Sequence, residues 1–456
     1  MRERKRSSKI KEKHLLKDTS EVKGHFHMDW GRQGTVIFAY VAVLLGYFGI
    51  VANIILINNI GLWIPFPEMD PTILIWTYKV YPQTYYLPIL LLFLISFLLC
   101  SFYVTAESIA GSQQRGLHIF YYSWYGNLKV DGQWAHWDHQ VLPYGDQPIV
   151  GRKGYPGGDD IGANFYPELG TYSANDEAIM DTHLAMMKQA GVSVIILSWW
   201  GDSDFGTSSV PIFMDKAAKI GLKVNFHIEP IYHSAAEFLQ VVKQLDQRFG
   251  QHPALYHYQG KPLYYVYDSY KMPISEWQKV LLPKGELTVR GKTYDANFIG
   301  LWVDKGEESF FLNSGMDGFY TYFAVDGFVY GSTTKNWPYL AKWAKQHNKL
   351  FIPSVGPGYA DDRIRPWNKK NFRAREAGKY YDAMFKKAIA VAPTFIGVTS
   401  FNEWHEGTQI EPAIEKQVGD YKYLDYSPLA ADYYLKRTHY WSERFQLSLN
   451  IRSVKD

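Results

Sequence analysis

Cysteine is almost missing from this 456-residue chain, which contains only Cys100. A disulfide within the chain is therefore excluded, and so is a metal site built from several thiolates. The sequence also lacks an Asn-x-Ser/Thr sequon, so N-glycosylation gives no indication of the compartment. It contains neither a Gly-x-Gly-x-x-Gly fingerprint nor a P-loop, which argues against a nucleotide-binding fold.

Excess positive charge is missing from most of the chain. The formal net charge is +3, but residues 1–33 hold ten Lys and Arg against five acidic residues, so this tail carries +5 and the remainder −2. A basic face for nucleic acid is therefore not expected outside the tail. A basic tail in front of a hydrophobic segment is more typical of the cytosolic flank of a membrane protein.

Two hydrophobic runs follow the basic tail, at about residues 36–57 and 87–104. A bilayer span needs about 20 apolar residues, and neither run ends in a convincing cleavage site. We therefore expect residues 1–112 to form an anchor region with one or two spans. Two spans would return the remainder of the chain to the cytosol, whereas one span would place it in a lumen. A start at Met69 would leave the second run as the single anchor of a type II protein.

The chain from residue 113 to residue 456 alternates between β-rich runs and helical patterns. Eight such repeats predict an α/β fold of the (β/α)₈ kind, a TIM barrel, with an open doubly wound sheet as the alternative. The predicted strands are 118–122, 193–199, 223–228, 262–267, 298–303, 318–322, 350–355 and 394–401. Helical patterns lie between many of them, for example at 176–190, 210–220, 235–249 and 373–391.

Aromatic and polar residues follow six of the eight predicted strands. The carboxyl ends of barrel strands share one rim, and enzymes of this fold carry their active sites there. Aromatic residues make up 17% of the chain, and flat rings of this kind can hold sugars. Rings that simply close the top of the barrel would give the same pattern, so the rim alone does not decide the function.

Two closely spaced carboxylates, Glu403 and Glu406, follow the last predicted strand. In a turn or at the start of a helix, residues three apart share a face, with about 5–6 Å between their Cβ atoms. This spacing suits an acid and a base on either side of a glycosidic bond. The alternative is structural: one Glu caps the following helix and the other pairs with an arginine.

Three other positions carry weaker signals. Glu229 lies between a predicted strand and Pro230, where it could bind sugar hydroxyls, support another site residue or form a salt bridge. Arg365 follows the seventh strand and could hold a sugar or orient a carboxylate. His136 and His139 suggest a metal, but no matching His/Asp cluster accompanies them. We expect this segment to bind substrate hydroxyls, and we expect no metal and no cofactor.

Long motifs in the barrel region resemble glycoside hydrolase family 99, the endo-α-1,2-mannosidases. The resemblance extends from about residue 117 to residue 445. The motifs that carry it are FYYSWYGN (120–127), DDIGANFYPELGTYS (159–173), FHIEP (226–230), YVYDSY (265–270), GFYTYFAVDGFVYGS (318–332), PSVGPGY (353–359), IRPWN (364–368) and TSFNEWHEGTQIE (399–411).

The resemblance implies a (β/α)₈ barrel and a retaining enzyme that needs no metal. Animal members similar to this chain are Golgi enzymes that cut glucosylated high-mannose N-glycans at an internal α-1,2-mannosidic bond and release a glucosyl-mannose oligosaccharide. It further implies a type II Golgi membrane protein with a lumenal catalytic domain. In the mechanism proposed for the family, one carboxylate deprotonates the mannose 2-hydroxyl, which attacks its own anomeric carbon to form a 1,2-anhydro sugar. The other carboxylate protonates the leaving oxygen and then activates water.

By motif position, Glu403 matches the carboxylate that deprotonates the 2-hydroxyl, and Glu406 matches the acid/base. The resemblance and the predicted strand ends together suggest eight residues for substrate binding. They are Tyr121, Trp124, Trp200, Glu229, Tyr322, Arg365, Asn402 and Trp404.

One departure from the vertebrate pattern concerns specificity. Vertebrate members of the family carry Tyr where this chain has Trp200, whereas bacterial mannan-degrading members carry Trp-Trp, as here. That position is expected to contact the sugar one step outward from the cleaved mannose, so broader, mannan-type specificity is an alternative. Another retaining glycosidase and a non-catalytic, lectin-like barrel are further alternatives, and the presence of both Glu403 and Glu406 argues against the lectin.

Overall fold

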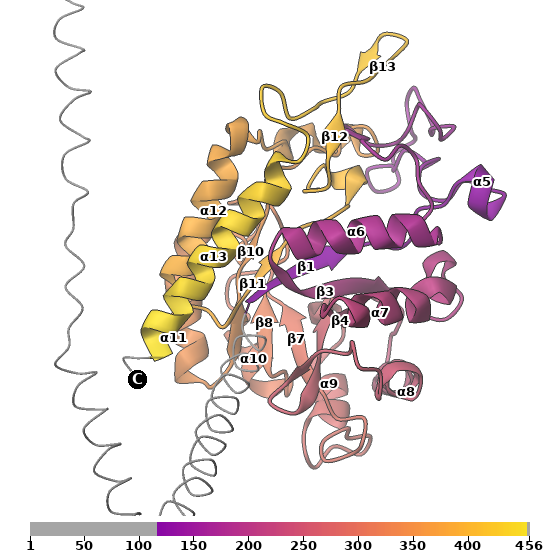
Figure 1. The fold of residues 1–456 in the computed structure, drawn as a ribbon. Coiled ribbons are helices and arrows are strands. Elements are labelled where there is room, and N and C mark those ends of the chain that lie inside the picture. The colour runs from indigo at the N-terminus through magenta and orange to yellow at the C-terminus, as the bar shows by residue number, and fades with distance from the viewer. Residues whose placement is uncertain (1–115, 454–456) are drawn as a thin grey trace, which may run out of the picture. The chain divides into compact units, whose positions relative to one another are not determined.

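The computed structural model describes residues 116–453, which form a nearly closed barrel of parallel strands surrounded by helices (Figure 1). Strands that are near neighbours in sequence pair in parallel around the ring, in the order β10-β11-β1-β3-β4-β6-β7-β8-β9. Their bounds are β1 Gly116–Tyr121, β3 Val192–Trp199, β4 Lys223–Ile228, β6 Lys261–Val266, β7 Asn297–Leu301, β8 Gly318–Tyr320, β9 Leu350–Ile352, β10 Ser354–Val355 and β11 Phe395–Val398.

The ring contains nine segments because one predicted strand, 350–355, is divided at Pro353 into β9 and β10. Proline has no backbone N–H and cannot donate to a neighbouring strand. The first half pairs with β8 and the second half with β11, so the divided strand joins the two ends of the sheet. Counted this way, eight strand positions close the ring, which is consistent with the predicted (β/α)₈ architecture.

Eight helices follow the eight strand positions and cover the outside of the ring (Figure 1). The predicted helix 373–391 is shorter than expected, because Glu376 and Ala377 adopt left-handed backbone conformations with φ of 51° and 49° and the regular helix begins only at Lys379. The helices are α6 Glu177–Gln189, α7 Val210–Lys219, α8 Ala235–Phe249, α9 Ile274–Leu281, α10 Glu308–Asn313, α11 Trp337–Gln346, α12 Lys379–Ala390 and α13 Tyr433–Ser453.

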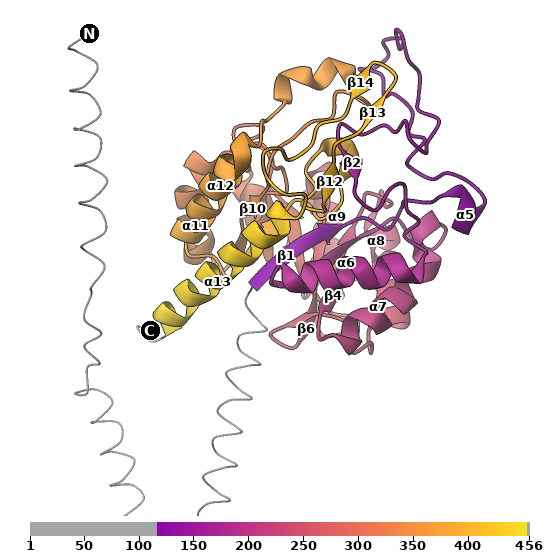
Figure 2. The same cartoon turned by 45° about the horizontal axis from the view of Figure 1, so that its top comes forward.

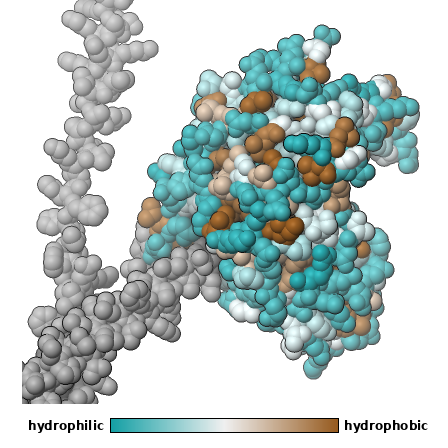
Figure 3. Space-filling view, turned by 45° about the vertical axis from the view of Figure 1, so that its right-hand side comes forward, coloured by the Kyte–Doolittle hydropathy of each residue, from teal (hydrophilic) through white to brown (hydrophobic). Residues whose placement is uncertain are grey.

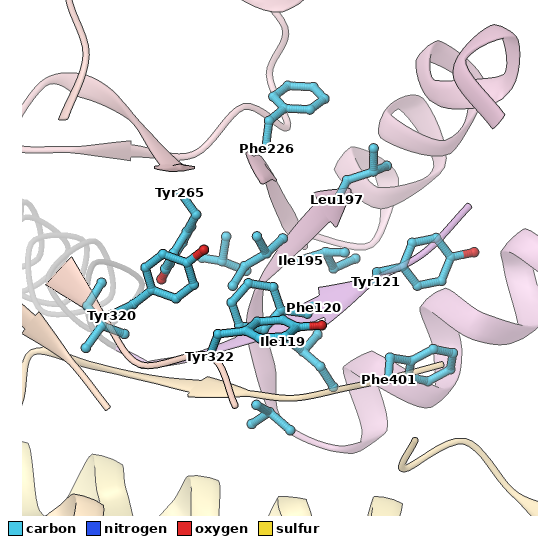
Figure 4. Close-up of a cluster of buried hydrophobic side chains, with 14 of the residues drawn as sticks. Ile119, Phe120, Tyr121, Ile195, Leu197, Phe226, Tyr265, Tyr320, Tyr322 and Phe401 are labelled. Atoms are coloured by element: carbon cyan, nitrogen blue, oxygen red, sulfur yellow. The ribbon is translucent and has the colours of Figure 1, made fainter. Parts of the chain in front are cut away.

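Side chains of β1 alternate between the inside of the barrel and the helices outside it, as the twofold period of a strand requires. Phe120 packs inside against Tyr320 and Tyr322. Tyr121 faces outward and stacks on Phe213 of α7. Figure 4 shows Phe120 and the two inner tyrosines gathered together, with Tyr121 pointing away from them.

The loops at the carboxyl ends of the strands build a cap over one end of the barrel, which includes the strand pairs β2 (Tyr166–Pro167) with β12 (Ala413–Ile414) and β13 (Gln417–Val418) with β14 (Tyr421–Lys422) (Figure 2). The face shown in Figure 3 is mostly hydrophilic, with separate hydrophobic patches. Among residues 116–453, no helix is both long enough and apolar enough to cross a membrane. The predicted anchor region, 1–112, lies outside the described residues.

Candidate active site

The two predicted carboxylates lie on a single 3₁₀ turn, Trp404–Glu406, just after β11. Glu403 caps the turn, because its carboxylate accepts a hydrogen bond from the backbone N–H of His405 at 3.1 Å. Gly407 ends the turn with φ of 62°, and a Cβ at this position would lie 2.8 Å from the carbonyl oxygen of Ala360. Both the left-handed conformation and the close approach favour glycine here. The turn is therefore fixed at both ends.

Glu406 forms an ion pair with Arg365, with 3.5 Å between Oε1 and Nη1. Asp361 lies 3.2 Å from the same Nη1, so two carboxylates share one guanidinium. The structural alternative considered from the sequence is thus realised in full: one Glu caps a turn and the other pairs with an arginine. These contacts do not exclude catalysis, since they hold both carboxylates in defined positions.

Burial raises the pKa of Glu403 well above its usual value, the charge of Glu406 raises it further, and Arg365 opposes the rise. Burial also raises the pKa of Glu406; Arg365 is the strongest opposing influence there, while Asp361 and Glu229 add to the rise. Two buried carboxyls that repel each other hold one proton between them over a wide pH range. In the free protein, Arg365 favours the ionised form of Glu406.

Two tyrosines border the carboxylates from other strands. Tyr122, directly after β1, and Tyr322, two residues after β8, place their hydroxyl oxygens 2.5 Å apart. Burial raises the pKa of both phenols well above the usual value, and the negative charges of Glu403 and Glu406 raise them further. Both phenols are therefore neutral. One hydroxyl donates to the other, which leaves one O–H available to donate beside the carboxylate pair.

Glu229 reaches the same region from the end of β4. Its carboxylate accepts a hydrogen bond from Ser198 at 2.7 Å and lies 3.0 Å from Nδ1 of His227. It is only 4% exposed, yet its charge contributes to the raised pKa of Glu406 and of Tyr122. Glu229 is therefore held in place by Ser198 and His227, and its charge acts on other groups of the site.

A group of imidazoles lies on the other side of the turn. Trp124 stacks on His136 with 4.5 Å between ring centroids, and His139 lies 4.6 Å from His405. Burial lowers the pKa of His136 to about 3 and also lowers the pKa of His139 and His405, so all three rings are neutral. In the described part of the chain, no group of three or more His, Cys, Asp or Glu side chains could hold a metal ion.

The expected substrate contact of Tyr121 needs correction. Its ring is 1% exposed and lies outside the barrel, where the hydroxyl is 3.1 Å from Nδ1 of His183 on α6. The neighbouring Tyr122 is the residue of this motif that reaches the carboxylates. Along a strand, a shift of one residue moves a side chain to the opposite face, which explains the difference.

Asn402 and Trp404 also support the site from behind instead of facing a ligand. Asn402 is fully buried and exchanges two hydrogen bonds with the backbone of Tyr122, at 2.8 and 2.9 Å. Trp404 is fully buried, and its indole N–H donates to Glu411 at 3.0 Å. Asn402 therefore joins the 3₁₀ turn to the end of β1, and Trp404 anchors the turn to a buried carboxylate.

Of the other residues predicted to bind substrate, Arg365 pairs with Glu406, and Glu229 and Tyr322 are close enough to interact electrostatically with that carboxyl. Trp124 lies against Tyr122, and Trp200 is 39% exposed at the end of β3. Substrate binding by these residues stays a prediction. Sequence reasoning missed three residues that the structure adds: Tyr122, Asp361 and Glu411. Each lies within or beside a quoted motif, but an acid or tyrosine in a motif gives no signal of the direction in which its side chain points.

The arrangement can supply one proton and accept another across a bond held between two carboxyls. Neutral phenols and imidazoles around the pair offer hydrogen-bond partners for hydroxyl groups. A ligand rich in hydroxyls, with a bond cleaved by acid–base chemistry, suits these groups best.

Comparisons with known proteins agree with this chemistry. The family described as "Glycosyl hydrolase family 99" matches residues 113–447. A glycoprotein endo-alpha-1,2-mannosidase of Mus musculus is 46% identical over 346 residues, which cover 72% of this chain and 74% of the relative. A glycoprotein endo-alpha-1,2-mannosidase-like protein of Homo sapiens is 42% identical over 348 residues, with coverage of 72% and 75%. The solved GH99 endo-alpha-mannosidase from Bacteroides thetaiotaomicron is 50% identical, with a TM-score of 0.71 over 73% of this chain and 98% of that chain.

Proposed function

The chain belongs to glycosyl hydrolase family 99, and from this premise we propose that it is an endo-acting, retaining α-1,2-mannosidase. Its substrate is a glucosylated high-mannose N-glycan, from which it releases a glucosyl-mannose oligosaccharide. The observation that carries the proposal is the pair of a buried Glu403 and a partly exposed Glu406 on one 3₁₀ turn at the carboxyl end of the barrel. Similarity to enzymes with this named activity supports the substrate class.

In the proposed mechanism, Glu403 takes the proton of the mannose 2-hydroxyl. The oxygen left by that proton attacks the anomeric carbon of the same sugar, the bond to the leaving oxygen breaks, and Glu406 protonates that oxygen. Glu406 then takes a proton from water, whose oxygen attacks the anomeric carbon of the 1,2-anhydro sugar. The bond from that carbon to the 2-oxygen breaks, and Glu403 returns its proton to this oxygen, which restores both carboxyls. The raised pKa of Glu406, caused mainly by burial, suits a general acid that must carry a proton at the start of cleavage.

The proposal includes a place in the cell. We infer one membrane span, a lumenal catalytic domain and residence in the Golgi, where such glycans pass. The basic tail and the hydrophobic runs in residues 1–112 support membrane attachment, and the family resemblance supports the organelle.

Product analysis tests the activity. The full chain in detergent is incubated with glucosylated and non-glucosylated high-mannose glycans, and the fragments are sized by mass spectrometry. A glucosyl-mannose disaccharide from the capped glycan alone supports the narrow specificity, and a mannobiose in addition supports the mannan-type alternative. Intact glycans with binding retained would instead favour a lectin.

Trp200 offers a matched test of the specificity. The exposed indole at the end of β3 is available to the sugar one step outward from the cleaved mannose. Trp200→Tyr should shift the ratio of the two products toward the glucose-capped substrate. An unchanged ratio would remove Trp200 from the specificity argument.

A further inference from the structure

Exposed aromatic side chains are concentrated on one end of the barrel. Among the described residues, seven large aromatic side chains are exposed, and six of them lie on loops that follow the carboxyl ends of strands. The seventh, Tyr339, lies on helix α11. The six are Tyr144, Trp200, Tyr270, Phe328, Trp367 and Phe372. Single exposed rings are ordinary, but a concentration beside a site indicates a binding surface.

Two of these rings form a pair. Tyr144 and Trp367 have ring centroids 5.1 Å apart with an angle of 53° between the planes, yet they remain 58% and 43% exposed. We call these two residues the rim pair. Because the rings contact each other only in part, each still presents apolar surface to solvent.

The rim pair is held rigidly although it is exposed. The indole N–H of Trp367 donates to the carbonyl oxygen of Leu142 at 3.1 Å, and the backbone N–H of Leu142 donates to Ile364 at 2.7 Å. These bonds tie the loop of Tyr144 to the segment that carries Trp367. A surface that is ordered before binding loses less conformational entropy when a ligand arrives.

The rim pair is continuous with the active site. Trp367 lies on the 3₁₀ segment Pro366–Asn371, and Arg365, the residue that caps this segment, is the ion-pair partner of Glu406. This short connection links the rim pair to Glu406, the carboxyl assigned to protonate the leaving oxygen, and not to Glu403. A ligand there would belong to the leaving-group half of the substrate.

We propose that Tyr144 and Trp367 form a remote carbohydrate subsite that binds a sugar ring on the leaving-group side of the cleaved bond. The C–H groups on one face of a pyranose carry partial positive charge and pack against the negative faces of aromatic rings. This inference rests on the proposed function. It assigns to the rim pair a part of a large glycan that the carboxylates themselves do not contact.

The test compares two substrates in the full-length protein. One is a complete, protein-free high-mannose glycan with its glucose cap, and the other is a short oligosaccharide with a single sugar on the leaving-group side. Trp367→Ala and Tyr144→Ala should each lower kcat/KM for the complete glycan by roughly tenfold and leave the short substrate unchanged. Trp367→Phe keeps a ring but removes the N–H that bonds Leu142, so it should lose less activity on the complete glycan than Trp367→Ala does.

Tyr339→Ala is the matched control, because Tyr339 is 47% exposed on the outer helix α11, where its hydroxyl donates to Glu308 of α10, and its loss should change neither substrate. An equal loss on both substrates would overturn the subsite in favour of a structural role, and no loss on either would also overturn it. A glycoprotein that carries the same glycan serves as a third substrate. A loss of activity on this glycoprotein alone would show that the rim pair contacts the polypeptide of the substrate and not its sugars, which would also overturn the subsite. If the wild-type protein cleaves neither substrate, the proposed function fails. Calorimetric binding of the complete glycan, weakened by Trp367→Ala or unaffected by it, then decides the subsite separately.

Discussion

At the scale of single residues, the site depends on how one proton is divided between Glu403 and Glu406. Arg365 lies against only one of the two carboxyls, so their surroundings differ although they are three residues apart. Pairs of acids whose environments differ commonly divide the acid and base roles of an active site. The next two predictions test this division.

Glu406→Gln should reduce kcat by about 10²–10⁴-fold on a glycan substrate while glycan binding persists, because a general acid contributes by that factor. On a substrate whose leaving group needs no proton, such as a fluoride, the first step should largely recover and appear as a burst of fluoride release, while the slow turnover after the burst still reflects the loss of Glu406 as the base that activates water. Glu403→Gln should lose activity on both substrates, since the 2-hydroxyl must still be deprotonated. Full activity of Glu406→Gln on the glycan would remove the acid/base assignment.

Arg365→Met should move the pH profile of kcat/KM to higher pH on both limbs. The guanidinium opposes the raised pKa of Glu403 and of Glu406, so both values rise when it is removed. On the acidic limb, the pair then loses its first proton at a higher pH. On the alkaline limb, the remaining proton is retained to a higher pH. Arg437→Met, which breaks a pair with Asp382 between α12 and α13, is the control and should not move the profile. A shift to lower pH would contradict the electrostatic account.

At the scale of the secondary-structure elements, all eight predicted strand positions are confirmed, because continuous apolar runs are a strong signal for buried parallel strands. The helix predicted at 373–391 begins only at Lys379, because Glu376 and Ala377 adopt left-handed backbone conformations. These residue types rarely do so, and the sequence therefore gives no signal of it. The site was predicted in outline from Glu403 and Glu406. What could not be predicted is the direction of each side chain, as the exchange between Tyr121 and Tyr122 shows.

The 3₁₀ turn is anchored by a buried carboxylate, Glu411, whose part in the site was not predicted. Glu411 is fully buried and accepts hydrogen bonds from Tyr172 at 2.8 Å and from the indole of Trp404 at 3.0 Å, with Nε2 of His183 at 3.2 Å. Trp404 lies between Glu403 and Glu406 in sequence. Glu411 therefore connects the turn to α6 and to the loop before it.

Glu411→Gln should lower kcat on the order of 10- to 100-fold with little change in KM, because an amide NH₂ would face donors and displace the turn. Asp295→Asn is the control: Asp295 is 6% exposed and bonds Lys261 and Arg290 at the amino end of the barrel. Both variants should lower Tm. If they also reduced kcat equally, Glu411 would have only a general structural role.

At the scale of the whole molecule, the barrel and the proposed anchor concern different properties of the protein. The described barrel contains both carboxylates and the residues shown here to surround them. The proposed anchor would decide which compartment the site faces. An odd number of spans leaves the barrel on the side opposite the basic tail, and an even number returns it to the same side.

Protease protection of the full chain in sealed microsomes distinguishes these arrangements. With one span and residues 1–33 in the cytosol, a tag at the carboxyl terminus should survive added protease until detergent opens the vesicles. A tag at the amino terminus should be removed at once, which controls for access of the protease. Loss of both tags from sealed vesicles would show that both hydrophobic runs span. The barrel would then face the cytosol, and a Golgi-lumenal role would be excluded even for a catalytically active protein.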